Sequence, residues 1–549
     1  MTYVITQNCC TDASCLSVCP VDCIRPLRTT VDLGEPQMLF IDPDACVDCA
    51  ACELECPVGA IYYEDDLPEH LEPYREINAS YFAQHPLDAA PSEVATKKDS
   101  VPPGSLRVAV VGAGPAACYA AQHLLDIDGV EVDVYERLPT PFGLVRAGVA
   151  PDHQRTKEIT DMFGLALGNP RLRCHFNVDI GTNLTHAELM SHHHAVIYAV
   201  GASRSRNLDI PGEQLAGSDA AAEFVGWYNG HPDHSPRTFD LSGKRAVIIG
   251  NGNVALDVAR VLLADATAIG STDIAVHALE ALNNSSIIEV VILGRRGPRE
   301  AAFSAAEFLA LTNLPNVDVV LEGGDLDTQE DDDFETALKL QTAREIASRP
   351  TTEGNKRIVF RFLASPVEII GAQRVEGLRI VRNSPSVPGS SAVDDMHDSE
   401  TIEASMVLRS IGYRGEALPD LPFDEETGRI PNEHGRVHDR DGANVAGTYV
   451  TGWIKRGSRG VIGTNRSCAL ETVRSLWMDF KDGRLAREPE SGAGLESVLQ
   501  QRGIQQVDWS GWKAIDALER ARGDESARPR IKLTEIAEMV EVAGASSAG

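Results

Sequence analysis

The chain has 549 residues, of which 43 % are hydrophobic and 5 % aromatic. This length predicts about three or four compact units, and an Ala/Val/Leu-rich composition is typical of parallel sheets covered by helices. The formal charge of -31 argues against binding to nucleic acid, whose phosphates would repel it, and against an acidic partner. We find neither a run of about 18 apolar residues nor a signal-peptide pattern, and therefore expect a cytoplasmic α/β protein that does not span a membrane.

Most of the cysteines lie close together near the N-terminus, between Cys9 and Cys56. In a reducing compartment, such clustering favours metal ligation over disulfides. The second half of this region has the spacing CxxCxxCxxxCP of two-cluster ferredoxins, in which three thiolates bind one cluster and the fourth binds the other. The motif consists of Cys46, Cys49, Cys52, Cys56 and Pro57. Structural zinc is the alternative, but it requires four-ligand sets without two trailing Cys-Pro elements.

The first half of the region departs from this spacing at one position. It has the pattern CxxDxxCxxxCP, with Asp12 where the central thiol is expected. Crossing the ligands as two-cluster ferredoxins do assigns Cys46, Cys49, Cys52 and Cys19 to one 4Fe-4S cluster, and Cys9, Cys15 and Cys56 to the other. A carboxylate is a weaker ligand for iron than a thiolate, so the second cluster is either 3Fe-4S or a 4Fe-4S cluster completed by Asp12. Cys10 and Cys23 stay unassigned.

A dinucleotide-binding pattern follows. Residues 106–111 form a β-branched run that ends in Gly112, Gly114 and Ala117 and opens into an Ala-rich helix. Small residues at this turn let the backbone approach a pyrophosphate at the helix N-terminus. A second predicted strand ends at Glu136, whose carboxylate can accept hydrogen bonds from a ribose, as FAD or NAD would require.

The chain contains a second copy of this pattern. The predicted strand Arg245–Ile249 runs into Gly250, Gly252 and Ala255, and a later strand over residues 287–293 is followed by Arg295 and Arg296. Guanidinium groups suit the 2′-phosphate of NADP(H), which an acidic residue would repel. The sequence therefore predicts two nucleotide sites, with NADP(H) preferred over NAD(H) at the second.

The remaining segments carry less chemistry. Residues 84–104 are polar and contain several prolines, which predicts a linker, and residues 323–334 and 385–400 are expected to be surface loops. Residues 498–542 have a helical spacing of apolar residues without recognisable chemistry. The histidines at 192–194 lack partner ligands at a matching spacing, so we do not expect a metal there.

These motifs carry a family resemblance. The N-terminal segment resembles the seven-iron or eight-iron bacterial ferredoxins over its whole length. The segments 110–125, 135–153, 250–263, 294–308 and 452–465 resemble the adrenodoxin-reductase family of ferredoxin-NADP reductases. The resemblance implies a small α+β ferredoxin domain followed by two Rossmann-like, doubly wound dinucleotide-binding domains. The expected divisions are a ferredoxin domain at 1–83, a linker at 84–104, an FAD-binding domain in two parts at 105–211 and 421–490, an NADP-binding domain at 212–420, and a helical tail at 491–549.

The resemblance also implies site residues. Those expected to line FAD are Ala117, Glu136, Leu144, Val178, Trp453, Gly460, Val461 and Ile462. Those expected to contact NADP are Arg206, Asn251, Gly252, Asn253, Val254, Arg295, Arg296 and Glu307. His153 and Glu307 match polar positions that the family places beside the nicotinamide, where a carboxylate can favour the positive product. We expect these two residues to tune hydride transfer and not to act as acid–base catalysts.

The expected function is ferredoxin-NADP reductase activity, with electrons passing between NADP(H), FAD and the two clusters. An external ferredoxin or another one-electron acceptor would complete the path. Because the linker shows no hydrophobic period, we expect the ferredoxin and reductase parts to be separable. Two alternatives remain: an NADPH-dependent input subunit of a larger oxidoreductase, similar to the glutamate synthase small subunit, and an electron carrier or scaffold whose nucleotide sites are relics.

Overall fold

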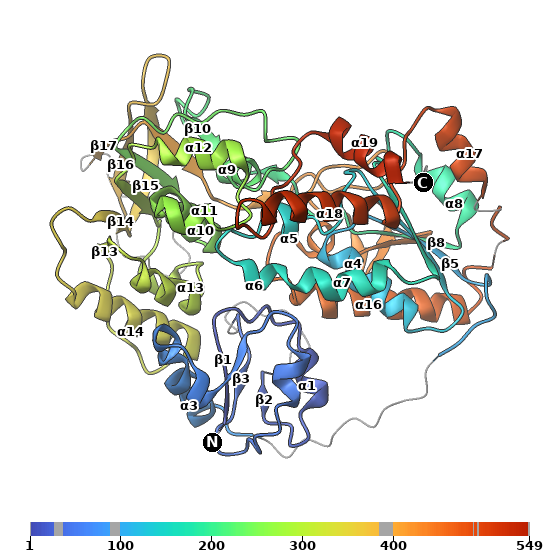
Figure 1. The fold of residues 1–549 in the computed structure, drawn as a ribbon, viewed down its shortest axis with the longest axis horizontal. Helices are drawn as coiled ribbons and strands as arrows, with labels where there is room; N and C mark the ends of the chain where they lie inside the picture. Colours follow the sequence, from blue (N-terminus) through green and yellow to red (C-terminus); the bar gives the residue numbers. More distant parts are fainter. Residues whose placement is uncertain are drawn as a thin grey trace.

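The computed structural model describes residues 2–26, 37–87, 99–383, 399–486, 488–490 and 493–546. In Figure 1 the N-terminal part lies below two larger α/β parts, each built around its own sheet. Two Rossmann-like units preceded by a small α+β unit confirm the predicted fold class. Most of the predicted loop at 385–400 and the middle of the predicted linker lie outside the described residues.

The N-terminal part has two similar halves. Its elements are β1 (Tyr3–Ile5), α1 (Ser14–Val18), β2 (Ile24–Arg25), β3 (Phe40–Ile41), α2 (Ala51–Glu55), β4 (Ile61–Tyr63) and α3 (Pro73–Gln84). Strand β1 pairs with β4 and β2 with β3, both antiparallel. The side chain of Asn78 on α3 accepts from the backbone N–H of Ile5 at 3.2 Å and of Ile41 at 2.9 Å. One buried amide therefore joins the two strand pairs to α3.

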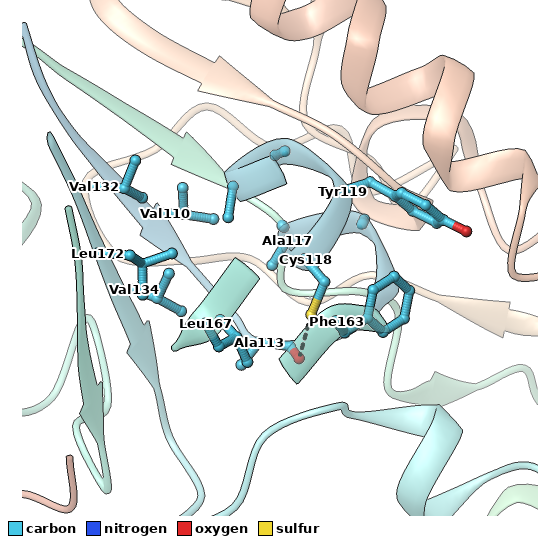
Figure 2. Close-up of a cluster of buried hydrophobic side chains, with 14 of the residues drawn as sticks. Val110, Ala113, Ala117, Cys118, Tyr119, Val132, Val134, Phe163, Leu167 and Leu172 are labelled. Atoms are coloured by element: carbon cyan, nitrogen blue, oxygen red, sulfur yellow. Dashed lines mark hydrogen bonds between the residues drawn. The ribbon is translucent and has the colours of Figure 1, made fainter. Parts of the chain in front are cut away.

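The second part contains a seven-stranded sheet in the order β20-β21-β22-β8-β5-β6-β7. Its strands are β5 (Arg107–Val111), β6 (Glu131–Glu136), β7 (Leu172–Phe176), β8 (Ala195–Tyr198), β20 (Asn432–Glu433), β21 (Arg436–His438) and β22 (Asn444–Val450). Its helices include α4 (Pro115–Leu125), α5 (Leu144–Ala147), α6 (Gln154–Lys157), α7 (Ile159–Leu167), α8 (His186–His192), α15 (Trp453–Arg456) and α16 (Thr464–Lys481). The segment from β7 through β5 and β8 to β22 is parallel, as alternating strands and helices predict. Helix α4 buries its apolar face against β5 and β6, where Ala117, Cys118, Val110 and Val134 pack together (Figure 2).

The third part contains a six-stranded parallel sheet in the order β10-β18-β11-β12-β14-β13. Its strands are β10 (Ser218–Ala220), β11 (Arg245–Ile249), β12 (Glu289–Leu293), β13 (Val317–Glu322), β14 (Lys356–Arg361) and β18 (Met406–Arg409). Its helices include α9 (Ala221–Tyr228), α10 (Asn253–Leu263), α11 (Ala266–Gly270), α12 (Val276–Asn283), α13 (Ala305–Ala310) and α14 (Phe334–Ser348). A three-stranded antiparallel sheet of β15 (Ala364–Ile370), β16 (Gly377–Arg382) and β17 (Ser399–Glu403) is inserted before β18. The strands β9 (Arg204–Ser205) and β19 (Tyr413–Arg414) pair where the chain enters and leaves this part.

The C-terminal segment is helical, as its apolar spacing predicts. It forms α17 (Ala493–Gln501), α18 (Trp509–Asp524) and α19 (Ile536–Ser546). Trp512, Ile515 and Leu533 are buried in the same core as α4 and β5. The segment therefore completes the hydrophobic core around the second sheet. Among the described residues, no helix combines the length and apolarity needed to cross a bilayer.

The N-terminal part packs directly on the third part. Phe334 of α14 lies 5.4 Å, between ring centroids, from both Phe40 and Tyr81, and Leu309 of α13 belongs to the same buried cluster. The Tyr74 hydroxyl donates to the Ala306 carbonyl at 3.4 Å. The polarity of the linker predicted separable parts. The structure shows instead an apolar interface formed by the parts themselves, which the linker sequence does not reveal.

Candidate cofactor sites

The two glycine loops have the same geometry. Gly112 and Gly250, each directly after a strand, have φ of +104° and +110°, and a Cβ atom would lie 2.6 Å from the Ala199 carbonyl oxygen or 2.1 Å from that of Ser410. Only glycine fits these turns. Gly114 and Gly252 follow as the N-terminal caps of α4 and α10. Each loop thus directs a helix N-terminus at the edge of a parallel sheet, where a pyrophosphate can bind.

Residues at the first loop support the FAD interpretation of the sequence. Ala117, at the third position of the motif, is 1 % exposed and lets α4 approach β5. The Glu136 carboxylate at the end of β6 accepts hydrogen bonds from Ala113 N at 2.8 Å and Leu138 N at 3.0 Å. Burial raises the pKa of Glu136, although these two amides lower it. Leu144 begins α5 and is exposed, whereas Val178 is buried and its backbone N–H donates to the Glu136 carbonyl at 2.9 Å.

Helix α15 and the segment that follows it contain the remaining residues that are predicted to contact FAD. Trp453 stacks on Tyr413 with ring centroids 5.8 Å apart, and its indole N–H donates to the Arg459 carbonyl at 3.2 Å. Val461 N donates to the Thr464 hydroxyl at 3.1 Å, which closes the turn before α16. Ile462 packs on the core that holds α4. We call residues 460–463 the α16 loop.

The second loop brings the predicted NADP residues together. Asn253 Oδ1 accepts from Ser304 N at 2.8 Å, while its Nδ2 donates to Gln37 of the N-terminal part at 3.1 Å. Asn251 Oδ1 accepts from Ala302 N at 3.4 Å. Val254 lies in the first turn of α10, next to Asn253. The segment before α13 is thus held against the loop by two asparagine side chains.

The predicted 2′-phosphate residues lie at the end of β12. Arg295 and Arg296 are exposed, and within the described parts of the chain neither guanidinium forms an ion pair. Arg206 follows β9, and its backbone N–H donates to the Gly412 carbonyl at 3.2 Å. The two guanidinium groups beyond β12 are therefore available to an anionic ligand at the strand end.

A charged cluster lies where the second and third parts meet. Arg260 of α10 is 5 % exposed in its side chain and pairs with Asp152 at 3.0 Å, Glu307 at 2.9 Å and Asp257 at 2.6 Å. It also contacts His153, whose Nε2 is 3.9 Å from Glu307 Oε2. The structure therefore joins the predicted residues His153 and Glu307 through an arginine. Sequence reasoning missed Arg260, Asp152 and Asp257, for which the i,i+3 spacing of Asp257 and Arg260 after a glycine loop was the available sign.

The three ligand-type side chains of this cluster do not require a metal. His153, Asp257 and Glu307 have atoms within 4.8 Å of one another, a spacing that could hold an ion. The Arg260 guanidinium, however, already lies among these groups and forms ion pairs with both carboxylates. The histidine run is likewise structural, because His193 Nε2 is 3.1 Å from Asp133 and His194 Nδ1 accepts from Arg107 N at 2.9 Å.

The cysteines assigned to the first cluster surround one small cavity. This cavity, near the surface of the N-terminal part, is lined by Cys19, Cys46, Cys49 and Cys52 together with Cys23 and Val47. The Sγ atoms of Cys19 and Cys23 are 3.5 Å apart, and Cys23 N donates to Cys19 Sγ at 3.4 Å. The crossed set predicted from sequence is thus brought together, and Cys23 lies beside it as a fifth thiol. Four converging thiols with an N–H donor to sulfur fit a 4Fe-4S cluster.

The second set is deeper in the molecule. Burial raises the pKa of Cys15, and the neighbouring thiols Cys9 and Cys56 raise it further. Leu39 N donates to Cys9 Sγ at 3.5 Å and Ala60 N donates to Cys56 Sγ at 3.3 Å. These three thiols are therefore close neighbours with amide donors to two of their sulfurs, as an iron–sulfur site requires. All twelve cysteines are free of disulfides.

Two nucleotide-binding units that meet at a charged cluster, joined to a cysteine-rich unit, define a flavin- and pyridine-nucleotide-dependent oxidoreductase with iron–sulfur clusters. Comparison with known families supports this class. Residues 106–296 match the pyridine nucleotide-disulphide oxidoreductase family, and residues 39–62 match the 4Fe-4S binding domain. The second match favours iron–sulfur ligation over structural zinc.

Known relatives match between 78 % and 99 % of this chain. A probable ferredoxin/ferredoxin–NADP reductase of Mycobacterium tuberculosis is 47 % identical over 99 % of this chain and 95 % of its own length. The mitochondrial NADPH:adrenodoxin oxidoreductase of Arabidopsis thaliana is 40 % identical over 78 % of this chain and 93 % of its own. The structure of Mycobacterium tuberculosis FprA in complex with NADPH matches with a TM-score of 0.75 and 45 % identity, over 80 % of this chain and 99 % of that one. The chain belongs to the ferredoxin–NADP reductase family and carries a ferredoxin domain at its N-terminus.

Proposed function

We propose that the chain transfers electrons from NADPH through FAD and its own ferredoxin domain to an external one-electron acceptor. The observation that carries this proposal is the continuity of the three sites. The charged cluster around Arg260 joins the FAD-binding and NADP-binding parts, and Gly463 of the α16 loop donates to the Cys10 carbonyl of the ferredoxin domain at 2.8 Å. One NADPH would reduce two acceptors, giving NADP⁺ and one proton. Contact between all three sites favours an electron-transfer enzyme over a scaffold whose nucleotide sites are relics.

The residues would share the chemistry in distinct roles. FAD, when bound, supplies the step between two-electron and one-electron transfer. Gly112, Gly114, Ala117, Glu136, Leu144, Val178, Trp453, Gly460, Val461 and Ile462 would hold it. Arg206, Asn251, Gly252, Asn253, Val254, Arg295 and Arg296 would hold NADP(H). Glu307 and His153 would lie beside the nicotinamide, where the carboxylate favours the positive product.

The domain divisions follow the same scheme. We propose a ferredoxin domain at 1–83, an FAD-binding domain at 105–211 and 421–490, and an NADP-binding domain at 212–420. The tail at 491–549 would belong with the FAD-binding domain, since Trp512, Ile515 and Leu533 share its core. A cytoplasmic location is supported by the free cysteines, because clusters of this kind need reduced thiols.

The external acceptor would bind where the first cluster site reaches the surface. Cys49 is exposed there, with Val47 at 55 % and Leu54 at 85 % exposure. Acidic residues such as Asp48 and Glu53 lie beside them in the chain. A small apolar centre with an acidic rim suits a one-electron acceptor with a basic docking face.

The proposal is tested by steady-state assays on the purified holoprotein. We expect NADPH oxidation with ferricyanide and with cytochrome c, two acceptors reduced per NADPH, and much weaker oxidation of NADH. Absence of NADPH oxidation by a preparation that holds FAD and iron would overturn the proposal in favour of a relic. Activity that appears only after addition of a further enzyme subunit would favour the input-subunit alternative.

A further inference from the structure

The segment that carries Asp12 is in backbone contact with the FAD-binding domain. Gly463 N donates to the Cys10 carbonyl at 2.8 Å, and a Cβ atom on Gly463 would lie 2.0 Å from the Thr11 carbonyl oxygen. Gly463 has ordinary helical dihedrals, φ −67° and ψ −24°. Its lack of a side chain is therefore required by the approach of the ferredoxin domain and not by the turn that it occupies.

The Asp12 carboxylate is fully engaged at this contact. Its side chain belongs to a residue that is 3 % exposed. Oδ2 accepts from the Tyr119 hydroxyl at 2.6 Å, and Oδ1 accepts from Ser14 N at 3.1 Å and from the Ser14 hydroxyl. Arg466 Nη1 is 3.5 Å from Oδ1 and donates to the Asp12 carbonyl at 2.7 Å. Two of the groups that hold Asp12, Tyr119 and Arg466, come from the FAD-binding domain.

The Tyr119 hydroxyl bonds to Asp12 from a largely buried position. Its ring extends from α4 into the core, edge-to-face with Phe163 at 5.0 Å between ring centroids, and Figure 2 shows its hydroxyl directed away from the labelled side chains of that core. Burial and the nearby Asp12 raise the pKa of Tyr119 well above 10.0, so the hydroxyl stays a neutral donor. A phenol buried at this depth needs an acceptor, and Asp12 of the other domain is the acceptor that it has.

The two cysteine sets face different directions. Cys9 and Cys56 pack on the core that holds α4 and Ile462 of the α16 loop. Cys46, Cys49 and Cys19 instead line the cavity near Val47, where Cys49 is exposed. The set that contains Asp12 in its motif is therefore the one adjacent to the FAD-binding domain.

We propose that Asp12 is a positioning residue and not an iron ligand: with Tyr119 and Arg466 it fixes the Cys9, Cys15 and Cys56 site against the α16 loop. That site then exchanges electrons with the FAD side, and the Cys19, Cys46, Cys49 and Cys52 site delivers them to the external acceptor. Each transfer moves one electron, forms and breaks no bond, and needs no further reactant. The order rests on the proposed function, whereas the docking role of Asp12 rests on the contacts alone. A cluster held by three cysteines is expected to be 3Fe-4S.

The ligand question is tested on full-length holoprotein with Asp12→Asn and Tyr119→Phe. We expect both variants to keep the wild-type iron content and the electron paramagnetic resonance signal of an oxidised 3Fe-4S cluster. Loss of iron, or a changed cluster signal, in Asp12→Asn but not in Tyr119→Phe would show that Asp12 binds iron and would overturn the proposal. Iron near eight atoms per chain without that signal in the wild type would also overturn it.

The positioning role of Asp12 is tested by measuring how fast, and in which order, the two clusters are reduced. After a laser flash that reduces the bound flavin, we expect the Cys9-set cluster to be reduced before the other, as freeze-quenched spectra would resolve. Tyr119→Phe and Gly463→Ala should slow this step about tenfold or more, and Tyr119→Phe should leave direct flavin reduction by NADPH unchanged. Matched controls are Tyr198→Phe, which loses a hydroxyl bonded to His186 inside the FAD-binding domain, and Gly544→Ala, which enters open space.

The outcomes separate the two proposals. An unchanged internal rate in both variants, or prior reduction of the Cys19-set cluster, would overturn the inference. A wild-type flavin that NADPH fails to reduce would overturn the proposed function. In that case the flash experiment still reports the internal step, because it does not depend on NADPH.

Discussion

Arg260 is the residue on which the proposed nicotinamide site depends. Its guanidinium is surrounded by Asp152, Asp257 and Glu307, which together raise its pKa although burial lowers it. Three carboxylates at this spacing would repel one another without a buried cation. Arg260 pairs with all three of them and therefore reduces this repulsion where the two domains meet.

The pH dependence of hydride transfer should report this cluster. Burial raises the pKa of Asp257 to about 6, with Glu307 and Asp152 adding to the shift while Arg260 and His153 oppose it. As pH rises through about 6, Asp257 ionises and adds negative charge that favours the positive nicotinamide product. Stopped-flow bleaching of the flavin by NADPH should therefore accelerate across this range. In Asp257→Asn the rate of flavin bleaching should not change with pH across this range. If this variant instead keeps the pH profile of the wild type, ionisation of Asp257 does not affect hydride transfer.

The choice of NADPH over NADH should depend on Arg295 and Arg296. Charge-assisted contacts of this kind contribute about 1.5 to 3 kcal/mol each, so removing both should raise the KM for NADPH more than tenfold. The KM for NADH should change little, because NADH has no 2′-phosphate. Steady-state kinetics of the double alanine variant with ferricyanide measure both values. An unaltered preference for NADPH over NADH would show that other residues bind the 2′-phosphate.

At the scale of elements, the strands and glycine loops were predictable and the domain contacts were not. Residues 245–249 form a strand because a β-branched run ends in a glycine that must adopt positive φ, which is local information. The bond between Asp12 and Tyr119 joins residues 107 positions apart, and neither position carries a local sign of it. Asp12 was therefore interpreted within its cysteine motif, where a metal ligand was the natural alternative.

Strand β6 contains a second buried charge, whose removal should destabilise the FAD-binding domain. Burial opposes ionisation of Asp133, but His175, His193 and Arg173 bond to its carboxylate and hold its pKa below the usual range. Asp133→Asn should lower the free energy of unfolding by about 3 to 5 kcal/mol. The exposed Asp331→Asn should change it little. Chemical denaturation at neutral pH measures both.

The same carboxylate predicts a pH window. Because its folded pKa is depressed, Asp133 stabilises the fold above the unfolded value of about 3.9, and this contribution is lost as pH falls further. The difference between wild type and Asp133→Asn should therefore shrink below about pH 4. A constant difference at all pH values would mean that the asparagine acts through packing and not through charge.

For the whole molecule, the interface at α13 and α14 decides what truncation does. Removing residues before Ser105 uncovers Leu309 and Phe334, which are 9 % and 6 % exposed against the ferredoxin domain. Each large apolar side chain stabilises by about 1.5 to 3 kcal/mol when buried, so the truncated chain should aggregate readily. It should nevertheless bind FAD and reduce ferricyanide with NADPH. Cytochrome c reduction should fall unless a separate ferredoxin is added.

A more soluble variant of the truncated chain provides the control for this experiment. Leu309→Ser with Phe334→Ser should restore solubility to the truncated chain. The same pair should destabilise the full chain, in which Phe334 packs on Phe40 and Tyr81 and Leu309 belongs to the same buried cluster. If the soluble truncated variant lacks FAD, the ferredoxin domain is part of the flavin-binding fold. If cytochrome c reduction is undiminished, the clusters do not lie on the electron path.

We propose that NADPH, FAD and both clusters form one continuous electron path within this chain. Anaerobic titration of the holoprotein with NADPH, followed by visible absorption and electron paramagnetic resonance, tests it most directly. We predict that the flavin band bleaches and that the oxidised 3Fe-4S signal disappears in the same titration, without any added protein. A flavin that bleaches while the cluster signals stay unchanged, although dithionite reduces them, would contradict the account.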